Sequence, residues 1–395
     1  MSTPEAVYIV AARRTPIGAF QGVLAPVRAP ELGAAAVRAA LERSGLAGAQ
    51  VDEVLLGCVL PAGLGQAPAR QAAIEAGIPP AVPATTINKV CGSGMKAAMV
   101  GCDAIRAGSA LRVVAGGFES MSNAPYLLPK VRAGLRLGHG ELLDHMFYDG
   151  LQNPADGALM GHFADLTARK FDFSRAEQDA FAAESVRRAL TACESGAFSA
   201  ELVAVKVKGR KGELLIERDE PPYGCDIGKI PKLKPAFSAD GTVTAASSSS
   251  IADGAAALVL MGESALREPG APAPLARVVA CAGHAQEPEW FTTAPAGAIR
   301  RVLGLAGWRA QDVDLYEINE AFAVVTLAAM RELALAHEKV NVNGGACALG
   351  HPIGASGARI IVTLVHALKA RKLQRGIASL CIGGGEATAM AVELV

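Results

Sequence analysis

The stretch that decides the fold is Asn88–Ala97, which reads N-K-V-C-G-S-G-M-K-A. At its centre, Cys91 is followed at once by Gly92-Ser93-Gly94, which lets the backbone turn tightly and come close to a ligand. Apolar residues follow at helix spacing: Met95, Ala98, Met99, Cys102 and Ile105. This pattern predicts that Cys91 lies at a turn before a helix that ends near Gly108.

The position of Cys91 predicts a reactive thiol. Free N–H groups and the helix dipole stabilise an anion at a helix N-terminus. A cysteine there can fall from a pKa of about 8.5 to between roughly 3.5 and 7.5. Such a shift stabilises the thiolate at pH 7 by only ~2 kcal/mol, so further groups are expected around Cys91.

Composition excludes several classes of protein. The 395 residues contain 38 Lys and Arg against 38 Asp and Glu, without the basic stripe that marks nucleic-acid binding. No apolar run reaches the ~18 residues of a membrane span, and the start has no targeting pattern. The eight cysteines form neither a C-x-x-C pair nor a metal-ligand pattern. We expect free thiols, no metal, no nucleic-acid or membrane partner, and a cytoplasmic location.

Outward from Cys91, strand and helix patterns alternate. Strands are predicted at Val7–Val10, Val54–Val59 and Leu111–Ala115, and helices at Glu31–Leu41 and Gln66–Ala76. From about Pro274 the same alternation resumes. This order predicts an α/β fold with a mostly parallel sheet.

Between these two regions, Ser122–Ser250 mixes prolines, glycines and charges with short apolar runs. One helix inside it is well marked, by a capping box from Ser174 to Glu177 and a stop at Gly196. We predict that this segment is an insertion that folds over the core. The expected division is 1–121 plus 251–273 as an N-terminal half, 122–250 as an inserted loop domain, and 274–395 as a C-terminal half.

A weak internal repeat relates the two halves. Ser93–Ala97 leads through a helix to Val113–Glu119, V-V-A-G-G-F-E, and Ser356–Ile360 leads through a helix to Leu380–Glu386, L-C-I-G-G-G-E. Val51-Asp52 is likewise echoed by Val313-Asp314. Two related halves facing each other would place Cys91 near the glycine-rich turn of the second half.

Three stretches of the second half carry polar groups at predicted element ends. Asn319-Glu320-Ala321-Phe322 follows a predicted strand, Leu315–Ile318, and opens a helix. Asn341–Arg359 holds His351 between glycines, next to Pro352. Cys381 ends another predicted strand and is followed by Ile382 and three glycines.

With these motifs the chain resembles the thiolase family over essentially its whole length. N-x-x-C-G-S-G, N-E-A-F, G-H-P-I-G-A-S-G and C-x-G-G-G occur in the family's order. The resemblance implies a duplicated five-layer αβαβα fold with an inserted loop domain. It also implies reversible thiolytic cleavage of 3-ketoacyl-CoA, or the reverse Claisen condensation. Coenzyme A is then a co-substrate, no cofactor is needed, and the protein is a homotetramer or homodimer.

The resemblance also implies catalytic roles. Cys91 takes the acyl group. His351 activates it and donates to a thioester oxygen, with Asn319 orienting a water in the same oxyanion hole. Cys381 is the general acid and base, and the backbone N–H groups of Cys91 and Gly383 form a second oxyanion hole. The alternatives for single residues are structural, such as a helix N-cap for Asn319.

For the binding pocket the resemblance is less close. Met160 is expected to line the acyl pocket beside Leu159, which stands where related short-chain enzymes carry a histidine. Phe291 is expected to face the acyl group, and Ser248-Ser249-Ser250 matches the segment that contacts the pantetheine. Tyr223 replaces an arginine that stacks on adenine. Acyl chain length, 2-methyl tolerance and the direction of the reaction in the cell stay open.

Two other functions compete with a catalytic thiolase. One is a non-catalytic coenzyme A-binding subunit of a fatty-acid oxidation complex, which would be expected to lack a catalytic group. The other is a condensing enzyme of the same fold that takes its acyl group from a carrier protein. In either an oligomeric enzyme or a subunit, Ser122–Asp149 is the segment expected to form an arm between dimers.

Overall fold

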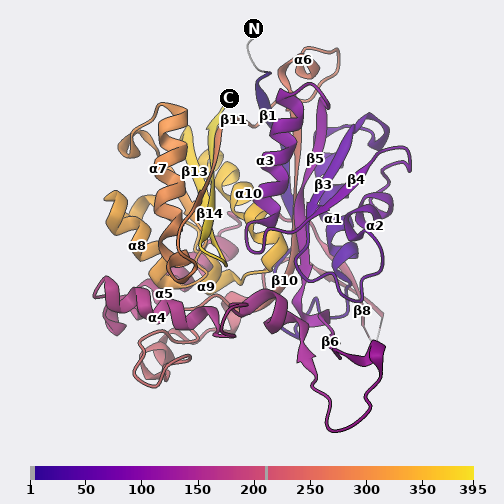
Figure 1. Ribbon diagram of the computed structural model, residues 1–395. Helices are drawn as coiled ribbons and strands as arrows, with labels where there is room; N and C mark the ends of the chain where they lie inside the picture. Colours follow the sequence, from indigo (N-terminus) through magenta and orange to yellow (C-terminus); the bar gives the residue numbers. More distant parts are fainter. Residues whose placement is uncertain (1–4, 210–211) are drawn as a thin grey trace.

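The protein is described by a computed structural model over residues 5–209 and 212–395 (Figure 1). The strands of the N-terminal half are β1 (Val7–Arg14), β2 (Gly18–Ala19), β3 (Glu53–Gly57), β4 (Ala84–Ile87), β5 (Arg112–Ser120) and β10 (Ala252–Gly262). Its helices are α1 (Ala29–Ser44), α2 (Pro68–Glu75), α3 (Ser93–Arg106) and the short α6 (Glu263–Leu266). Each strand and helix predicted for this half is present, with ends that differ by a few residues.

The C-terminal half follows the same order. Its strands are β11 (Ala276–Ala285), β12 (Leu315–Ile318), β13 (Arg375–Ile382) and β14 (Glu386–Leu394). Its helices are α7 (Ala294–Ala306), α8 (Ala323–Leu333), α9 (Ala346–Leu349) and α10 (Ile353–Arg371). The strands predicted to precede Asn319 and to carry Cys381 are therefore confirmed.

The sheet runs through both halves in the order β12-β13-β14-β11-β1-β10-β5-β3-β4, with β2 beside β10. Helices α7 and α8 lie outside one half and α1 and α2 outside the other, while α3 and α10 pack together in the middle (Figure 1). This arrangement has the five αβαβα layers expected. One apolar core surrounds α3 and α10, and a further core lies beneath each outer helix layer.

The prediction of a mostly parallel sheet is wrong. Among the described strands of this sheet, only β3–β4, β3–β5 and β12–β13 pair in parallel. Strands β1, β10, β11 and β14 pair antiparallel with their neighbours. The prediction failed because β14 follows β13 through a tight glycine turn, whereas a parallel pair needs a crossover of a dozen or more residues.

Equivalent contacts confirm the internal repeat. The Asp52 carboxylate accepts hydrogen bonds from the backbone N–H groups of Leu111 and Arg112, both at 2.8 Å. The Asp314 carboxylate accepts from those of Gln374 and Arg375, both at 2.9 Å. The spatial order β1-β10-β5-β3 of one half matches β11-β14-β13-β12 of the other.

The two central helices approach closely because each carries a glycine at the crossing. A Cβ on Gly94 would lie 2.8 Å from the backbone nitrogen of Ala358, and one on Gly357 would lie 2.4 Å from that of Met95. These glycines occupy matching places in the repeat. The crossing brings the starts of α3 and α10 together, and with them Cys91 and His351.

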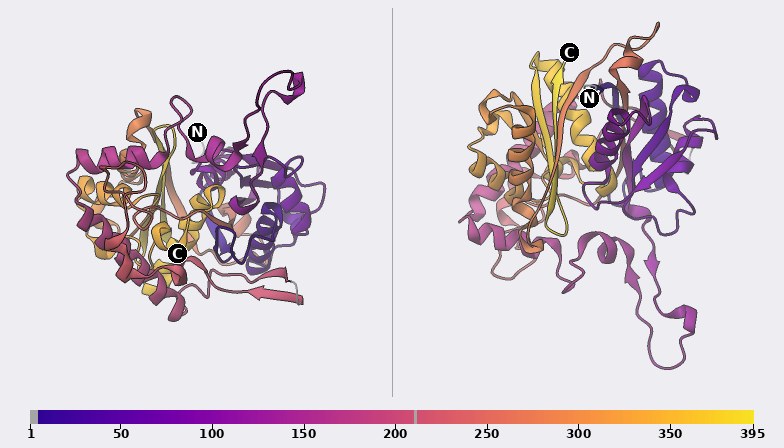
Figure 2. Two further views of the ribbon diagram at one scale, coloured as in Figure 1. Left: turned by 90° about the horizontal axis from the view of Figure 1, so that it is seen from below. Right: turned by 45° about the horizontal axis from the view of Figure 1, so that its top comes forward.

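The segment between β5 and β10 contains further elements. They are β6 (Tyr126–Leu127), β7 (Leu143–Asp144), a π-helix (Met146–Leu151), α4 (Met160–Lys170), α5 (Arg175–Glu194), β8 (Val205–Gly209) and β9 (Gly212–Ile216). The capping box that starts α5 is confirmed, since Ser174 Oγ accepts from the backbone N–H of Glu177. Strands β6 and β7 carry an arm that projects from the molecule (Figure 2). The three-part division of the chain stays a prediction.

Helix α10 is long and apolar enough to cross a membrane by length and composition. However, 83% of that stretch is buried inside the protein. It packs on α3 and on both halves of the sheet. Its apolar character is therefore explained by its place at the centre of the fold.

Candidate active site

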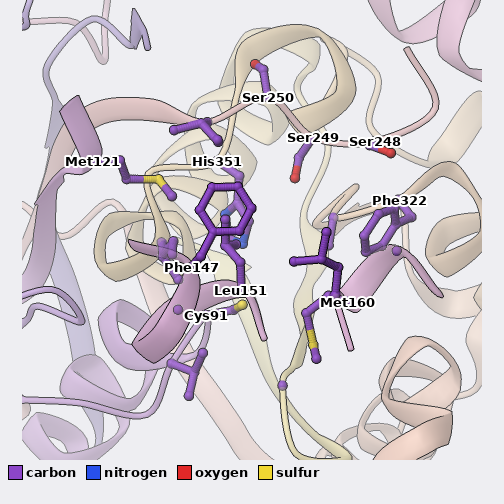
Figure 3. A pocket seen from close by; sticks show the side chains of 18 of the residues that line it. Cys91, Met121, Phe147, Leu151, Met160, Ser248, Ser249, Ser250, Phe322 and His351 are labelled. Carbon is purple, nitrogen blue, oxygen red and sulfur yellow. The ribbon is translucent and has the colours of Figure 1, made fainter. Parts of the chain in front are cut away.

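A cavity of about 200 Å³ opens beside Cys91, where both halves and the insertion meet. Figure 3 shows Cys91 and His351 on its wall, with Met121 and Phe147 to one side and Met160 and Phe322 to the other. The predicted residues that line the cavity are Cys91, Leu159, Met160, Ser248, Ser249, Ser250, Phe291, His351 and Gly383. Asn319, Cys381 and Tyr223 do not line it.

The turn that carries Cys91 is held by local hydrogen bonds. Ser93 Oγ accepts from the Lys89 backbone N–H at 2.9 Å and donates to the Val90 carbonyl at 2.6 Å. Val90 has a φ of 46°, which is unfavourable for a β-branched residue. Strain of this kind persists only where the surroundings enforce it. The turn therefore holds the Cys91 sulfur just before the N-terminus of α3.

The prediction of a lowered pKa for Cys91 is wrong. Burial raises the pKa of this thiol to about 11, although the backbone N–H groups of Gly383 and Cys91 itself counteract the rise. The apolar walls remove the hydration that a thiolate needs, and this outweighs the N–H groups at the start of α3. The free protein therefore holds Cys91 as a neutral thiol at pH 7.

His351 lies just before α10 with a defined tautomer. Its Nδ1 is 2.5 Å from Ser356 Oγ, and that hydroxyl donates to the Pro352 carbonyl at 2.9 Å. We assign the Ser356 hydroxyl proton to that carbonyl, so that Nδ1–H of His351 is the donor to Ser356 Oγ. Nε2 is then unprotonated, and it is buried without a hydrogen-bond partner. Burial and the charge of Arg359 lower the pKa of His351 to about 3, so the ring is neutral.

Cys381 and Gly383 come from the end of β13. Burial raises the pKa of the Cys381 thiol well above its usual value, and negative charge on the neighbouring Cys91 raises it further. Cys381 therefore stays protonated at neutral pH. A Cβ on Gly383 would lie 3.6 Å from Met160 Sδ and 3.8 Å from Val90, so this glycine sits between the acyl wall and the Cys91 turn.

Asn319 follows β12 and is fully buried. Arg359 donates to Oδ1 of Asn319 at 3.4 Å, and Nδ2 of Asn319 has no hydrogen-bond partner. The alternative that Asn319 is a helix N-cap is wrong, because Phe322 is the N-cap of α8. Its unpaired amide N–H groups suit the orientation of a water, which is the role that the resemblance implies.

The backbone joins the serine segment to both catalytic loops. Ser249 N–H donates to the Ala321 carbonyl, and His351 N–H donates to the Ser250 carbonyl, both at 2.9 Å. Tyr223 lies away from the cavity, nearly half exposed, with the Arg218 guanidinium 5.0 Å from its ring centroid. Its predicted stacking on adenine stays a prediction.

Sequence reasoning missed much of the apolar wall. Phe147, Gly150 and Leu151 come from the π-helix, which has no periodic sequence signal. Phe237 comes from an irregular part of the insertion. Phe322 could have been found, because it stands in the N-E-A-F motif; its ring packs edge to face on Phe291, with centroids 6.5 Å apart.

The described residues, 5–209 and 212–395, contain no group of His, Cys, Asp and Glu side chains arranged to hold a metal ion. An ion pair between Lys89 and Glu386 ties the Cys91 turn to the residue after Gly385. In and beside the cavity lie two thiols, one imidazole and the backbone N–H group of Gly383.

Comparison with known proteins agrees with this geometry. Residues 7–264 match the family model for the thiolase N-terminal domain, and residues 272–394 match that for the C-terminal domain. The acetyl-CoA acetyltransferase of Pseudomonas aeruginosa is 52% identical, covering 97% of this chain and 98% of the relative. That of Escherichia coli is 49% identical, covering 98% of each. The crystal structure of the Bacillus anthracis acetyl-CoA acetyltransferase superposes with a TM-score of 0.97 at 43% identity, covering all of both chains.

Proposed function

The chain belongs to the thiolase family, and we propose that it is an acetyl-CoA acetyltransferase that works through an acyl-cysteine at Cys91. As a thiolase it cleaves 3-ketoacyl-CoA with coenzyme A, and the reaction is reversible. The observation that carries the residue assignment is the convergence of the Cys91 thiol, the free Nε2 of His351 and the Gly383 N–H on one cavity. The printed names of the relatives support acetyl transfer.

In the first step Cys91 attacks the 3-keto carbon of the substrate. Its proton passes to Nε2 of His351 as the S–C bond forms, so no free thiolate is needed beforehand. This order suits a thiol whose pKa is about 11 beside an imidazole whose pKa is about 3. The backbone N–H groups of Cys91 and Gly383 are placed to stabilise the oxyanion that forms.

In the second step the bond between carbons 2 and 3 breaks. The electron pair stays on carbon 2, next to the thioester carbonyl, and its charge develops on that oxygen. His351, now carrying a proton on Nε2, and a water held by Asn319 donate to this oxygen. Cys381 supplies the proton to carbon 2, which its raised pKa allows because the thiol is protonated before the step.

In the third step the thiol of coenzyme A replaces acetyl-CoA in the cavity. It loses its proton to Cys381 and attacks the acyl group on Cys91, and Cys91 regains its proton from His351. Cys91, His351 and Cys381 end in their starting protonation states: Cys91 regains its own proton, and the proton that Cys381 gave to carbon 2 is replaced by that of the coenzyme A thiol. The reverse order gives the Claisen condensation.

The cavity walls favour a short acyl group. Phenylalanines at 147, 237, 291 and 322 surround a space of about 200 Å³, which leaves little room beyond the thioester. Leu159 adds a further apolar contact, where a histidine was expected from short-chain relatives. We propose acetoacetyl-CoA and other short 3-ketoacyl-CoAs as substrates.

We also propose that the protein is a homotetramer, with the arm between β6 and β7 joining two dimers. The support is the number of exposed apolar side chains in the arm. Five of them are more than 40% exposed, namely Leu128, Val131, Leu135, Leu137 and Leu142, and Leu137 is 100% exposed. Strand β4 ends the sheet and is only partly covered, as expected for an edge that pairs with a second subunit. A cytoplasmic location is proposed from the sequence alone.

Thiolysis of acetoacetyl-CoA by Cys91→Ser tests the assignment. We expect a loss of at least about 10³-fold in kcat, since a serine hydroxyl is a far weaker nucleophile beside this base. Cys193→Ser, in α5 and away from the cavity, is the matched control and should keep full activity. A Cys91→Ser protein at wild-type rate would exclude the mechanism. A wild-type protein that binds coenzyme A without acyl transfer would instead indicate a non-catalytic subunit.

A further inference from the structure

The oxyanion hole of the first step is built from both halves of the molecule. The Cys91 N–H comes from the turn before α3, and the Gly383 N–H comes from the turn between β13 and β14. Both residues lie in the wall of the same cavity. Two donors on separate segments act together only when their spacing is fixed, because a displacement of about 1 Å can cost about 100-fold in rate.

The turn that carries Gly383 is made of three glycines and has no side chains with which to hold itself. Gly384 and Gly385 have φ values of 92° and 89°, which glycine adopts without strain. A Cβ on Gly384 would meet no atom of the described residues within 4 Å. The Gly385 carbonyl accepts from the Gln286 N–H at 2.9 Å, which anchors the turn towards β11. The distance of this turn from Cys91 therefore depends on its contacts with the Cys91 turn.

An apolar contact and a charged contact join the two turns. A Cβ on Gly92 would lie 2.4 Å from Cδ1 of Ile382, so the backbone of the Cys91 turn lies directly on that side chain. Nζ of Lys89 forms an ion pair with Oε2 of Glu386, the first residue of β14. Ile382 precedes the three glycines and Glu386 follows them. The glycine turn is thus held to the Cys91 turn at both of its ends.

Lys89 is well placed to act on the position of the nucleophile. It is two residues before Cys91, and its backbone N–H donates to Ser93 Oγ at 2.9 Å. The side chains of Lys89 and Glu386 are 28% and 39% exposed, and both lie outside the cavity wall. A pair this exposed adds little to the stability of a fold. An effect of the pair on the reaction would therefore come from the placement of the turns.

We propose that the Lys89–Glu386 ion pair is a positioning contact that sets the spacing of the Cys91 and Gly383 N–H groups in the oxyanion hole. This inference rests on the proposed function, because it assigns both N–H groups to the oxyanion of the acyl transfer. With the pair intact, both groups face the place where that oxygen becomes charged. Without it, the glycine turn moves away from Cys91, and formation and breakdown of the acyl-cysteine both slow.

The test measures thiolysis of acetoacetyl-CoA by Lys89→Met, Glu386→Gln, the double variant of these two, and the swap Lys89→Glu with Glu386→Lys. Each single variant should lower kcat by about 5–20-fold, a part of the 10²–10³-fold that loss of a whole donor costs. KM for coenzyme A should stay within about twofold, and Tm within about 2 °C. Because both residues act through one contact, the double variant should be no slower than the singles. The swap should return kcat to within about threefold of wild type.

Alkylation of Cys91 gives a second measurement that does not depend on turnover. The Gly383 N–H favours the thiolate of Cys91, so each single variant should react with iodoacetamide at pH 8 about 2–5-fold more slowly, and the swap at nearly the wild-type rate. Arg300→Met and Glu332→Gln are the matched controls. They break an ion pair of similar exposure between α7 and α8, and both rates should stay unchanged.

Three results would overturn the proposal. The first is a wild-type kcat in both single variants, and the second is a double variant in which the two losses multiply. The third is a raised KM for coenzyme A in Lys89→Met with a lowered KM in Glu386→Gln, which would show that the charges act on coenzyme A. An inactive wild-type protein would instead overturn the proposed function, and the alkylation rates of Cys91 would still decide the role of the pair.

Discussion

Cys91 and His351 face the same cavity as a neutral thiol and a neutral imidazole, not as a preformed thiolate–imidazolium ion pair. The thiol keeps its proton because burial raises its pKa to about 11, and the ring stays neutral because burial and Arg359 lower its pKa to about 3. An apolar cavity disfavours both charges. Activation therefore depends on proton transfer during attack rather than on a resting thiolate.

This pairing predicts the pH dependence of alkylation at Cys91. The thiolate is the reactive form, so the rate with iodoacetamide should keep rising between pH 7 and pH 10, by up to about tenfold per pH unit. His351 should add no inflection near pH 6.5 to this rate profile. Its pKa is lowered to about 3, so the ring is already neutral across the pH range of the experiment. Peptide mapping isolates the rate at Cys91. A plateau reached below pH 8 would show a preformed thiolate.

Ser356 is predicted to set the tautomer of His351. In Ser356→Ala the Nδ1–H loses its acceptor, the ring can present either nitrogen, and kcat for thiolysis should fall by about tenfold or more. KM should change little, because Ser356 does not line the cavity. Thr363→Ala, two turns along the same helix, removes a hydroxyl bonded to Glu201 and is the control. A Ser356→Ala enzyme within twofold of wild type would contradict this role.

At this scale the sequence predicted the chemical groups but not their ionisation. The Cys91 turn, the free side of His351 and the end of β13 follow from local motifs. The pKa of Cys91 does not, because the residues that dehydrate it, such as Phe147 and Phe237, come from irregular parts of the insertion. Their approach to the sulfur is a tertiary property.

Among the elements, α3 and α10 matter most, because their crossing places the nucleophile and the base at one point. Gly94 and Gly357 allow backbone to meet backbone at the crossing, and Gly117 of β5 allows the same against Gly354 of α10. The order of strands and helices could be predicted from the sequence. Strand direction could not, because the tight turn after β13 reverses the chain without a distinctive hydrophobic pattern.

Gly117 gives the sharpest test of this packing. A Cβ there would lie 2.0 Å from the Gly354 carbonyl oxygen, three residues after His351. Gly117→Ala must push β5 and α10 apart, with an expected cost of about 1–3 kcal/mol in the free energy of unfolding and reduced thiolysis. Gly283→Ala in β11 is the matched control, because its nearest contact is 3.8 Å away. Equal unfolding free energies of Gly117→Ala and wild type, measured by denaturant titration, would show that β5 and α10 are not tightly packed at Gly117.

The whole molecule is two matching halves with an insertion that completes the cavity. To the cavity the first half supplies Cys91, the second supplies His351 and Gly383, and the insertion supplies most of the acyl wall. The sequence predicted this arrangement through its repeat. The sequence could not give the bounds of the arm precisely. Residues of an exposed hairpin do not pack on a core, so they show no regular alternation of apolar and polar residues.

Removal of the arm should change the oligomer and spare the subunit. A variant in which an Asn-Gly turn replaces residues 128–142 can still pair β6 with β7. Light scattering should then give twice the subunit mass of 40.4 kDa, whereas the proposed tetramer of the intact protein would give four times that mass. Leu137→Ser tests whether the fully exposed leucine contributes to the contact. An unchanged mass after removal would place the contact between dimers elsewhere.

The most direct test of catalysis through an acyl-cysteine at Cys91 is the intact mass of the protein after exposure to acetoacetyl-CoA without free coenzyme A. Longer and 2-methyl-branched 3-ketoacyl-CoAs offered in the same mixture report the acyl preference. We predict one acetyl group per subunit, mapped to Cys91 and removed by added coenzyme A. An adduct on another residue, or none in protein shown to bind coenzyme A, would contradict catalysis through Cys91.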